Sequence, residues 1–237
     1  MGEGMSNDAL IMPYISSANI ACGYHAGNID TMKKTIALAL QHNVAIGAHP
    51  GFDDKENFGR TEQHLSNDKY YTLVREQLHI IQQVVDEEGA LLHHVKPHGA
   101  LYNMSARDER LANIIATAVK DHNPLLVLYG LSNSYSITAA EQLSLTTVSE
   151  VFADRTYTDD GRLTSRKDTN ALIISEQQTL QQVLQMIQQQ TVTSVNNKIV
   201  KVKADTICIH GDGAHAAAFA KLIFETLKQN NIAIKTI

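Results

Sequence analysis

Residues 29–51, IDTMKKTIALALQHNVAIGAHPG, decide the class of fold because they pass from a helical pattern directly into a buried strand. Apolar side chains recur from Ile29 to Leu40 at intervals of three or four, which predicts one face of a helix. Residues 44–48 then form a short apolar run, typical of a strand buried on both faces. A helix that leads into such a strand is the repeating step of a parallel sheet with crossover helices.

The same step repeats along the whole sequence. Short β-rich runs lie at residues 18–22, 44–48, 91–95, 125–129, 146–151, 171–174, 205–209 and 232–237. Helical spacing of apolar residues recurs between them, at 111–118, 180–187 and 219–227. The pattern predicts an α/β fold, either closed into a barrel or open as a doubly wound sheet. No Pro- or Gly-rich linker divides the chain, so we expect one domain over residues 1–237.

Net charge and composition argue against several classes of partner. The net charge is -5, and no run of Lys or Arg is longer than a pair, which argues against nucleic acid or an anionic membrane. The first residues lack a basic and apolar leader, and no stretch approaches the ~18 apolar residues of a membrane span. Cys22 and Cys208 sit in apolar runs and are expected to be reduced thiols, consistent with a cytoplasmic protein.

Four of the eleven histidines follow β-rich runs, each close to a glycine: His25, His49, His98 and His210. A single histidine at a strand end is usually structural, but loops that follow parallel strands form the site of such folds. A fifth run ends in Glu150-Val-Phe-Ala-Asp154-Arg155, and Lys96 and Asp212 lie beside two of the histidines. We therefore expect these nine residues to converge on one rim and to supply acid/base groups and anion-binding cations together.

Six other histidines are expected elsewhere. His42, His64, His79 and His122 fall on predicted helices or outer loops and should be exposed. His93 and His94 are adjacent on a predicted strand, so they should point to opposite sides of it.

Several motifs are absent from the sequence: the G-x-x-x-x-G-K-[ST] loop, G-x-G-x-x-G after a strand, G-x-S-x-G, H-E-x-x-H and C-x-x-C. A self-sufficient P-loop ATP site is therefore not expected. Metal binding stays open, because three histidines and an aspartate could meet in space. Their long sequence gaps carry no ligand-spacing signal, and no metal ligand is assigned.

Blocks around these residues resemble the LamB/YcsF family, which is identified with the A subunit of bacterial ATP-dependent 5-oxoprolinase. The matching blocks run in family order over nearly the whole chain: SANIACGYHAG (17–27), VAIGAHPG (44–51), FGR (58–60), HVKPHGALY (94–102), SEVFADR (149–155), DGRL (160–163) and ADTICIHGD (204–212). The longer blocks are highly specific.

This resemblance implies an irregular β/α barrel of seven strands, similar to the glycoside hydrolase/deacetylase class. It implies opening of 5-oxo-L-proline to L-glutamate with hydrolysis of ATP, together with subunits B and C. Family members open with a strand reading approximately Asp-Leu-Asn-x-Asp-x-Gly-Glu, of which only Gly2-Glu3 is present. We therefore expect the first strand to be absent, a gap beside residues 18–22, and residues 1–5 loosely ordered or lying across that gap.

The implied reaction needs a base for water, an acid for the ring nitrogen and cations for carboxylate and phosphate. The acid/base candidates are His49, His98, Glu150 and Asp212. The candidates for substrate or anion binding are His25, Lys96, Asp154, Arg155 and His210, with Arg60 on a lid loop. Two alternatives stay open: a metal-dependent deacetylase or amidohydrolase on the same fold, and a non-catalytic subunit that only binds a small molecule.

Overall fold

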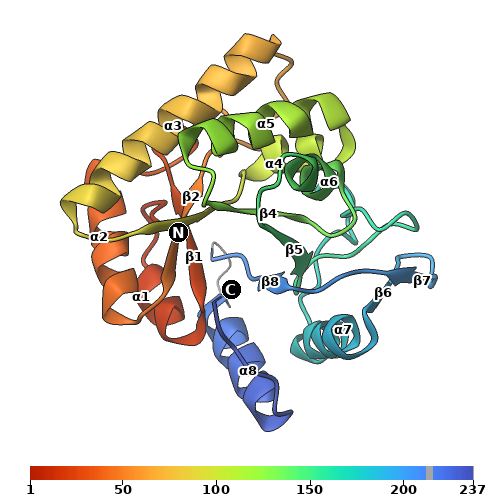
Figure 1. Cartoon of the computed structure of the whole chain (residues 1–237). Helices are drawn as coiled ribbons and strands as arrows, with labels where there is room; N and C mark the ends of the chain where they lie inside the picture. The colour runs from red at the N-terminus through yellow and green to blue at the C-terminus, as the bar shows by residue number, and fades with distance from the viewer. Residues whose placement is uncertain (212–215, 237) are drawn as a thin grey trace. The chain divides into compact units, whose positions relative to one another are not determined.

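The computed structural model describes residues 1–211 and 216–236, and helices alternate with strands along most of them (Figure 1). The chain packs as two compact units. The first comprises Met1–Gly130, Ser134–Thr147 and the segment from Lys235, and the second comprises Leu131–Asn133 and Val148–Ile234. That these units make up one domain stays a prediction.

The first unit is built on four parallel strands in the order β1-β2-β3-β4. Its strands are β1 (Ser17–Ala21), β2 (Ala45–His49), β3 (Leu92–Val95) and β4 (Val127–Leu131). Its helices are α1 (Asp8–Ile11), the 3-10 turn η1 (Met12–Tyr14), α2 (Ile29–Gln41), α3 (Asn67–Glu87), α4 (Gly99–Arg107), α5 (Glu109–His122) and α6 (Tyr135–Gln142). The α/β class and the parallel strands with crossover helices are as predicted.

Local sequence explains how α2 leads into β2. The side chain of Asn28 accepts a hydrogen bond from the Thr31 amide at 3.0 Å, which caps the first turn of α2. Asn43 ends the helix with φ 54°, a conformation that asparagine tolerates, and the chain turns straight into the strand. Met32 and Ile36 are buried as predicted, but Ile29 and Leu40 at the two ends of α2 stay exposed.

Register brings the ends of these strands together. Ala21 lies opposite His49 in the β1–β2 pair, and Ala48 lies opposite Val95 in the β2–β3 pair. Residues that follow the three strands therefore emerge at one edge of the sheet. In Figure 1, the helices α3 and α5 of this unit lie side by side, and their buried faces include Leu78 and Leu111.

β1 is the outer strand of the first unit, and no strand precedes it among the described residues, as predicted. The Met1 amino group donates to the carbonyl oxygen of Asn19 at 2.8 Å, and the Ala21 amide donates to the carbonyl oxygen of Met1 at 2.9 Å. These two bonds are those of a parallel pair between Met1 and Ile20. The N-terminal segment thus lies across the edge of β1, one of the two arrangements expected for it.

The second unit contains a parallel pair, a hairpin and two helices. Its elements are β5 (Thr147–Phe152), β8 (Thr206–Cys208), the antiparallel β6 (Thr191–Thr193) and β7 (Ile199–Lys201), α7 (Glu176–Gln189) and α8 (Ala216–Gln229). The Ser175 hydroxyl accepts from the Gln178 amide and caps α7, as the Ser-x-x-Gln spacing predicts. The β6–β7 hairpin was not predicted.

Two predicted strands are wrong. Residues 171–174 form only an isolated bridge between Arg155 and Leu172, because Leu172 and Ile174 are exposed and have no buried face to pack. Residues 232–236 also form no strand. Both cysteines are free thiols, as expected. No helix in the described ranges is long and apolar enough to cross a membrane.

Candidate functional site

Three of the predicted histidines meet at the carboxyl ends of β1, β2 and β3 in the first unit. The His25 and His98 rings stack with centroids 3.8 Å apart, and the His49 ring stands edge-on to both, 5.7 Å from His25 and 4.8 Å from His98. All three are buried, with relative exposures of 1%, 9% and 7% for His25, His49 and His98. The parallel register of the strands explains this convergence, which the sequence predicted.

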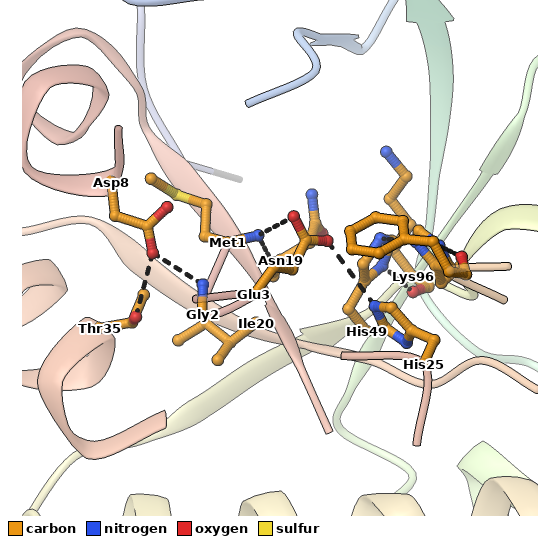
Figure 2. Close-up of polar contacts among 12 residues, drawn as sticks. Met1, Gly2, Glu3, Asp8, Asn19, Ile20, His25, Thr35, His49 and Lys96 are labelled. Atoms are coloured by element: carbon orange, nitrogen blue, oxygen red, sulfur yellow. Dashed lines mark hydrogen bonds and ion pairs between the residues drawn. The ribbon is translucent and has the colours of Figure 1, made fainter. Parts of the chain in front are cut away.

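A fourth member, Glu3, completes what we call the histidine cluster (Glu3, His25, His49 and His98). The Glu3 carboxylate lies 3.7 Å from Nε2 of His25, between Met1 and the histidines (Figure 2). Glu3, His49 and His98 each offer one ligand atom, and these atoms lie within 4.8 Å of one another. Sequence reasoning noted Gly2-Glu3 only as the end of a family motif and did not assign Glu3 to the site.

The N-terminal segment is held in place by polar contacts and by a glycine. The Asp8 carboxylate accepts from the Gly2 amide at 2.7 Å and from the Thr35 hydroxyl at 3.2 Å (Figure 2). A Cβ on Gly27 would come within 2.2 Å of the Gly2 carbonyl oxygen. Only glycine at position 27 therefore lets the segment approach closely enough for Glu3 to face the histidines.

Backbone carbonyl groups fix the tautomers of two rings. Nδ1 of His49 lies 2.6 Å from the Lys96 carbonyl oxygen, and Nε2 of His98 lies 2.8 Å from the Phe58 carbonyl oxygen. A carbonyl can only accept, so each of these nitrogens carries its proton. The remaining nitrogens, Nε2 of His49 and Nδ1 of His98, face one another at 3.0 Å.

Glycines let the loop at residues 51–60 cover these rings. A Cβ on Gly51 would lie 2.8 Å from Nδ1 of His25, and one on Gly59 would lie 2.8 Å from Cβ of His25. Gly59 has φ +63°, in the left-handed region that glycine adopts without strain. The glycines that flank His49 and precede Arg60 thus provide space for the imidazoles.

Burial sets the charge of the cluster. Desolvation, together with neighbouring imidazoles, lowers the pKa of His49 well below 6.5 and that of His98 to about 3. Both rings are therefore neutral at pH 7. Burial alone would raise the pKa of Glu3, but the Met1 amino group and His25 outweigh it and hold this pKa below its ordinary value.

A polar layer lies next to the cluster in the same unit. His94 is fully buried, contacts the Asn19 amide oxygen through Nε2 at 3.0 Å, and stacks on Tyr129 at 4.2 Å. A Cβ on Gly47 would lie 2.0 Å from Nε2 of His94, so this glycine makes room for the ring. Of the adjacent pair, His94 is the inward residue and His93 is only half-buried.

The predicted cations of the first unit flank the cluster. Lys96 is 5% exposed, and its Nζ lies 5.6 Å from the centre of the Tyr102 ring. Arg60 is exposed and its guanidinium lies 4.9 Å from the centre of the Phe58 ring. Of the histidines predicted at the surface, His42, His64 and His79 are exposed and His122 is half-buried.

The second unit holds a separate group, the charged trio (Asp154, Arg166 and His210). Nδ1 of His210 lies 2.9 and 3.0 Å from the two Asp154 oxygens, and Nε2 lies 2.9 Å from the Arg166 guanidinium. Arg166 can only donate, so Nε2 accepts and Nδ1 donates to the carboxylate. Burial opposes ionisation of Asp154, but His210 holds the pKa of this carboxyl below its ordinary value.

The other predicted residues of the second unit lie at or near β5. Glu150 is buried on β5. The Arg155 guanidinium donates to the carbonyl oxygens of Ala171 and Thr164, and burial lowers its pKa to about 10. Asp212 lies outside the described residues. Convergence of all nine predicted residues on one rim stays a prediction. The contacts among His25, His49 and His98 in the first unit, and between Asp154 and His210 in the second, are observed.

Fold and site together define an α/β protein of parallel strands with a buried histidine–carboxylate cluster at the strand ends. The LamB/YcsF family matches residues 1–237, and the chain belongs to this family. It is 50% identical over 233 residues to a Bacillus cereus protein named as the A subunit of 5-oxoprolinase, covering 98% of this chain and 92% of that protein.

Two further comparisons agree. A Staphylococcus aureus protein, which bears the same name, is 49% identical over 242 aligned residues, covering 100% of this chain and 97% of the relative. The crystal structure of a lactam utilization protein from Thermus thermophilus superposes with a TM-score of 0.92 at 36% identity, covering 99% of this chain and 94% of that one.

Proposed function

We propose that this protein is the A subunit of an ATP-dependent 5-oxoprolinase, a hydrolase that opens the cyclic amide of 5-oxo-L-proline to give L-glutamate. The observation that carries the proposal is 50% identity, over 98% of the chain, to a relative with that name. The Thermus thermophilus protein, named for lactam utilization, supports the same substrate class.

Ring opening of a lactam needs activation, because the amide is stabilised by resonance. Transfer of the γ-phosphoryl group of ATP to the ring carbonyl oxygen makes the carbon electrophilic. Water then adds to this carbon, the ring nitrogen takes a proton as the C–N bond breaks, and a second water releases phosphate. The products are glutamate, ADP and phosphate, and two waters are consumed.

The buried imidazoles suit the proton transfers. Nε2 of His49 and Nδ1 of His98 carry no proton at neutral pH, so either can accept a hydrogen bond from the attacking water, and both residues are proposed as acid/base groups. Glu150 and Asp212 are proposed as the other acid/base groups. Lys96 and Arg155 would bind carboxylate and phosphate, with Arg60 on the covering loop and with His25, Asp154 and His210 contributing to substrate binding.

ATP use is proposed to depend on the partner subunits B and C, within the cytoplasm. The sequence has no phosphate-cradling G-x-x-x-x-G-K-[ST] loop, so the purified chain alone should hydrolyse ATP negligibly. Substantial ATPase activity of the chain alone would contradict this part of the proposal.

The test is release of glutamate from 5-oxoproline plus ATP, measured with and without subunits B and C. We expect turnover only with the partners and ATP together. Glutamate release without ATP would indicate an amidohydrolase that works independently of nucleotide. Binding of 5-oxoproline without turnover, even with the partners present, would indicate a non-catalytic subunit.

A further inference from the structure

We propose that the histidine cluster binds one divalent transition-metal ion, with Glu3, His49 and His98 as ligands. Metal binding does not depend on which lactam the protein opens. It can be measured without substrate, so its failure and the failure of the proposed function are distinguishable.

The first argument concerns which ring nitrogens of His49 and His98 carry a proton. His49 and His98 each donate their one N–H to a backbone carbonyl, at 2.6 and 2.8 Å. Two neutral rings therefore turn bare lone pairs toward one another across 3.0 Å. Such a contact is repulsive unless a cation lies between or beside the two nitrogens.

The second argument is that neither ring nitrogen of His25 makes a hydrogen bond among the described residues, the nearest charged group being the Glu3 carboxylate. The His25 side chain is nevertheless fully buried. The 3.7 Å separation from the Glu3 carboxylate is too long for a hydrogen bond. A buried polar group without a partner costs stability and calls for an explanation such as an ion. The ring stacks directly on His98, so it lies within the same cluster.

The third argument is geometric. Two ligand atoms bound at about 2.0–2.1 Å are roughly 3.0 Å apart at a right angle and roughly 3.4 Å apart at the tetrahedral angle. The 3.0 Å between Nε2 of His49 and Nδ1 of His98 lies in this range. Glu3 offers a carboxylate oxygen within 4.8 Å of one ring nitrogen of each of these histidines.

The fourth argument is the environment of the rings. Histidines that bind metals usually donate their other N–H to a carbonyl or carboxylate, which fixes the ring and makes it more basic. The Lys96 and Phe58 carbonyls do this for His49 and His98. Imidazole and carboxylate ligands suit Zn²⁺, Mn²⁺, Fe²⁺ or Co²⁺, whereas Mg²⁺ and Ca²⁺ prefer an all-oxygen shell.

The competing explanation is one extra proton shared between His49 and His98 and balanced by Glu3. A shared proton brings one positive charge to the two nitrogens, whereas a divalent ion brings two positive charges and can also bind the Glu3 carboxylate. The two explanations predict different metal contents, so an experiment separates them.

The experiment uses the full chain without a polyhistidine tag, stripped with a chelator and then dialysed against Zn²⁺, Mn²⁺ or Co²⁺ in turn. We expect about one equivalent of one of these ions by elemental analysis, and visible absorption bands from bound Co²⁺. His98→Ala and Glu3→Gln should each retain at least tenfold less metal. His42→Ala and Glu56→Gln, which change exposed residues of the same kinds, should retain as much as the unaltered chain.

Two results would overturn the proposal. One is an unaltered chain that retains less than a tenth of an equivalent of each ion and melts at the same temperature with and without it. The other is metal content unchanged by His98→Ala. If His98→Ala does not fold, the melting shift of the unaltered chain with each ion decides, because a ligand that binds only the folded state must raise it.

Discussion

The histidine cluster and the charged trio are both built on histidine and carboxylate, but their protons are arranged in opposite ways. In the charged trio, Arg166 donates to His210 and His210 donates to Asp154, so each of these contacts pairs a donor with an acceptor. In the histidine cluster, the donors of His49 and His98 face backbone carbonyls and the acceptors face each other. In the charged trio the donors and acceptors satisfy one another without a ligand. In the histidine cluster two acceptors face each other, and a cation or a proton is needed to remove their repulsion.

The largest expected effect comes from removing an imidazole of the histidine cluster. His49→Ala should lower glutamate release by about 10²- to 10⁴-fold, because the variant loses a proposed acid/base group that is also a proposed metal ligand. The measurement is turnover of 5-oxoproline and ATP with subunits B and C present. His42→Ala is the matched control, since His42 is exposed on the same unit and should retain full turnover. Equal turnover of both variants would remove His49 from the chemistry.

A smaller loss is expected from the charged trio, because its carboxylate orients His210 rather than transferring a proton itself. Asp154→Ala should lower kcat/KM by about 10- to 100-fold, since the ring of His210 loses the acceptor that fixes its tautomer. Asp168→Ala alters an exposed aspartate in the same unit and serves as the control. A loss as large as that of His49→Ala would mean that the trio holds a group as essential as the cluster.

Close packing around the histidine cluster can be tested with a pair of glycines. Gly59 and Gly89 have nearly equal φ, +63° and +65°, but only at Gly59 would an added Cβ lie within 3.0 Å of the His25 and His98 side chains. Gly59→Ala should cost about 1–3 kcal/mol more free energy of unfolding than Gly89→Ala, because both share the backbone strain and only one collides. Urea denaturation measures the free energy of unfolding of both variants. Equal losses would show that the loop at residues 51–60 moves aside to accommodate the added Cβ.

The pH dependence of stability separates the two groups again. Folding holds the pKa of His98 at about 3, below its ordinary 6.5, so the unfolded chain binds a proton first as the pH falls. The metal-free protein should therefore lose up to about 1.4 kcal/mol of unfolding free energy per pH unit from this ring between pH 6.5 and 3.

Asp154 acts in a lower window. Its pKa is depressed from 3.8, so its contribution is present above that pH and is lost as the pH falls through the folded value. The His98 contribution is tested with His98→Asn. The free energy of unfolding of this variant, measured by urea denaturation, should depend less on pH between about pH 6.5 and 4 than that of the unaltered chain. A slope that persists in this variant would have to come from other groups.

Sequence alone predicted the strand ends and their histidines well, because both depend on local pattern. Residues 44–48 are apolar and end at His49, and this alone places the ring at the rim of a parallel sheet. Exposure is harder to predict, since Leu172 and Ile174 have strand composition but stay at the surface. The β6–β7 hairpin was missed although Asn197, with φ 60°, occupies a typical turn position.

Residues from segments without their own pattern were also missed. Glu3 reaches the cluster only because Met1 pairs with β1 and Gly27 leaves room, and neither contact has a signature in sequence. Arg166 stands in the polar stretch Ser165-Arg-Lys-Asp168, whose composition is typical of a solvated loop. The tautomers of His49 and His98 depend on carbonyls distant in sequence, so only the three-dimensional structure reveals them.

The hydrogen bond from His98 to the Phe58 carbonyl oxygen connects the histidine cluster to the loop at residues 51–60 that covers it. That loop is further tied by the Ala100 amide, which donates to the Gly59 carbonyl oxygen at 3.0 Å. A ligand that fixes the His98 ring should, by thermodynamic reciprocity, also stabilise the observed arrangement of residues 58–60. Amide hydrogen exchange at Ala100 should therefore slow when a ligand occupies the cluster, reporting its occupancy from a site that no ligand touches.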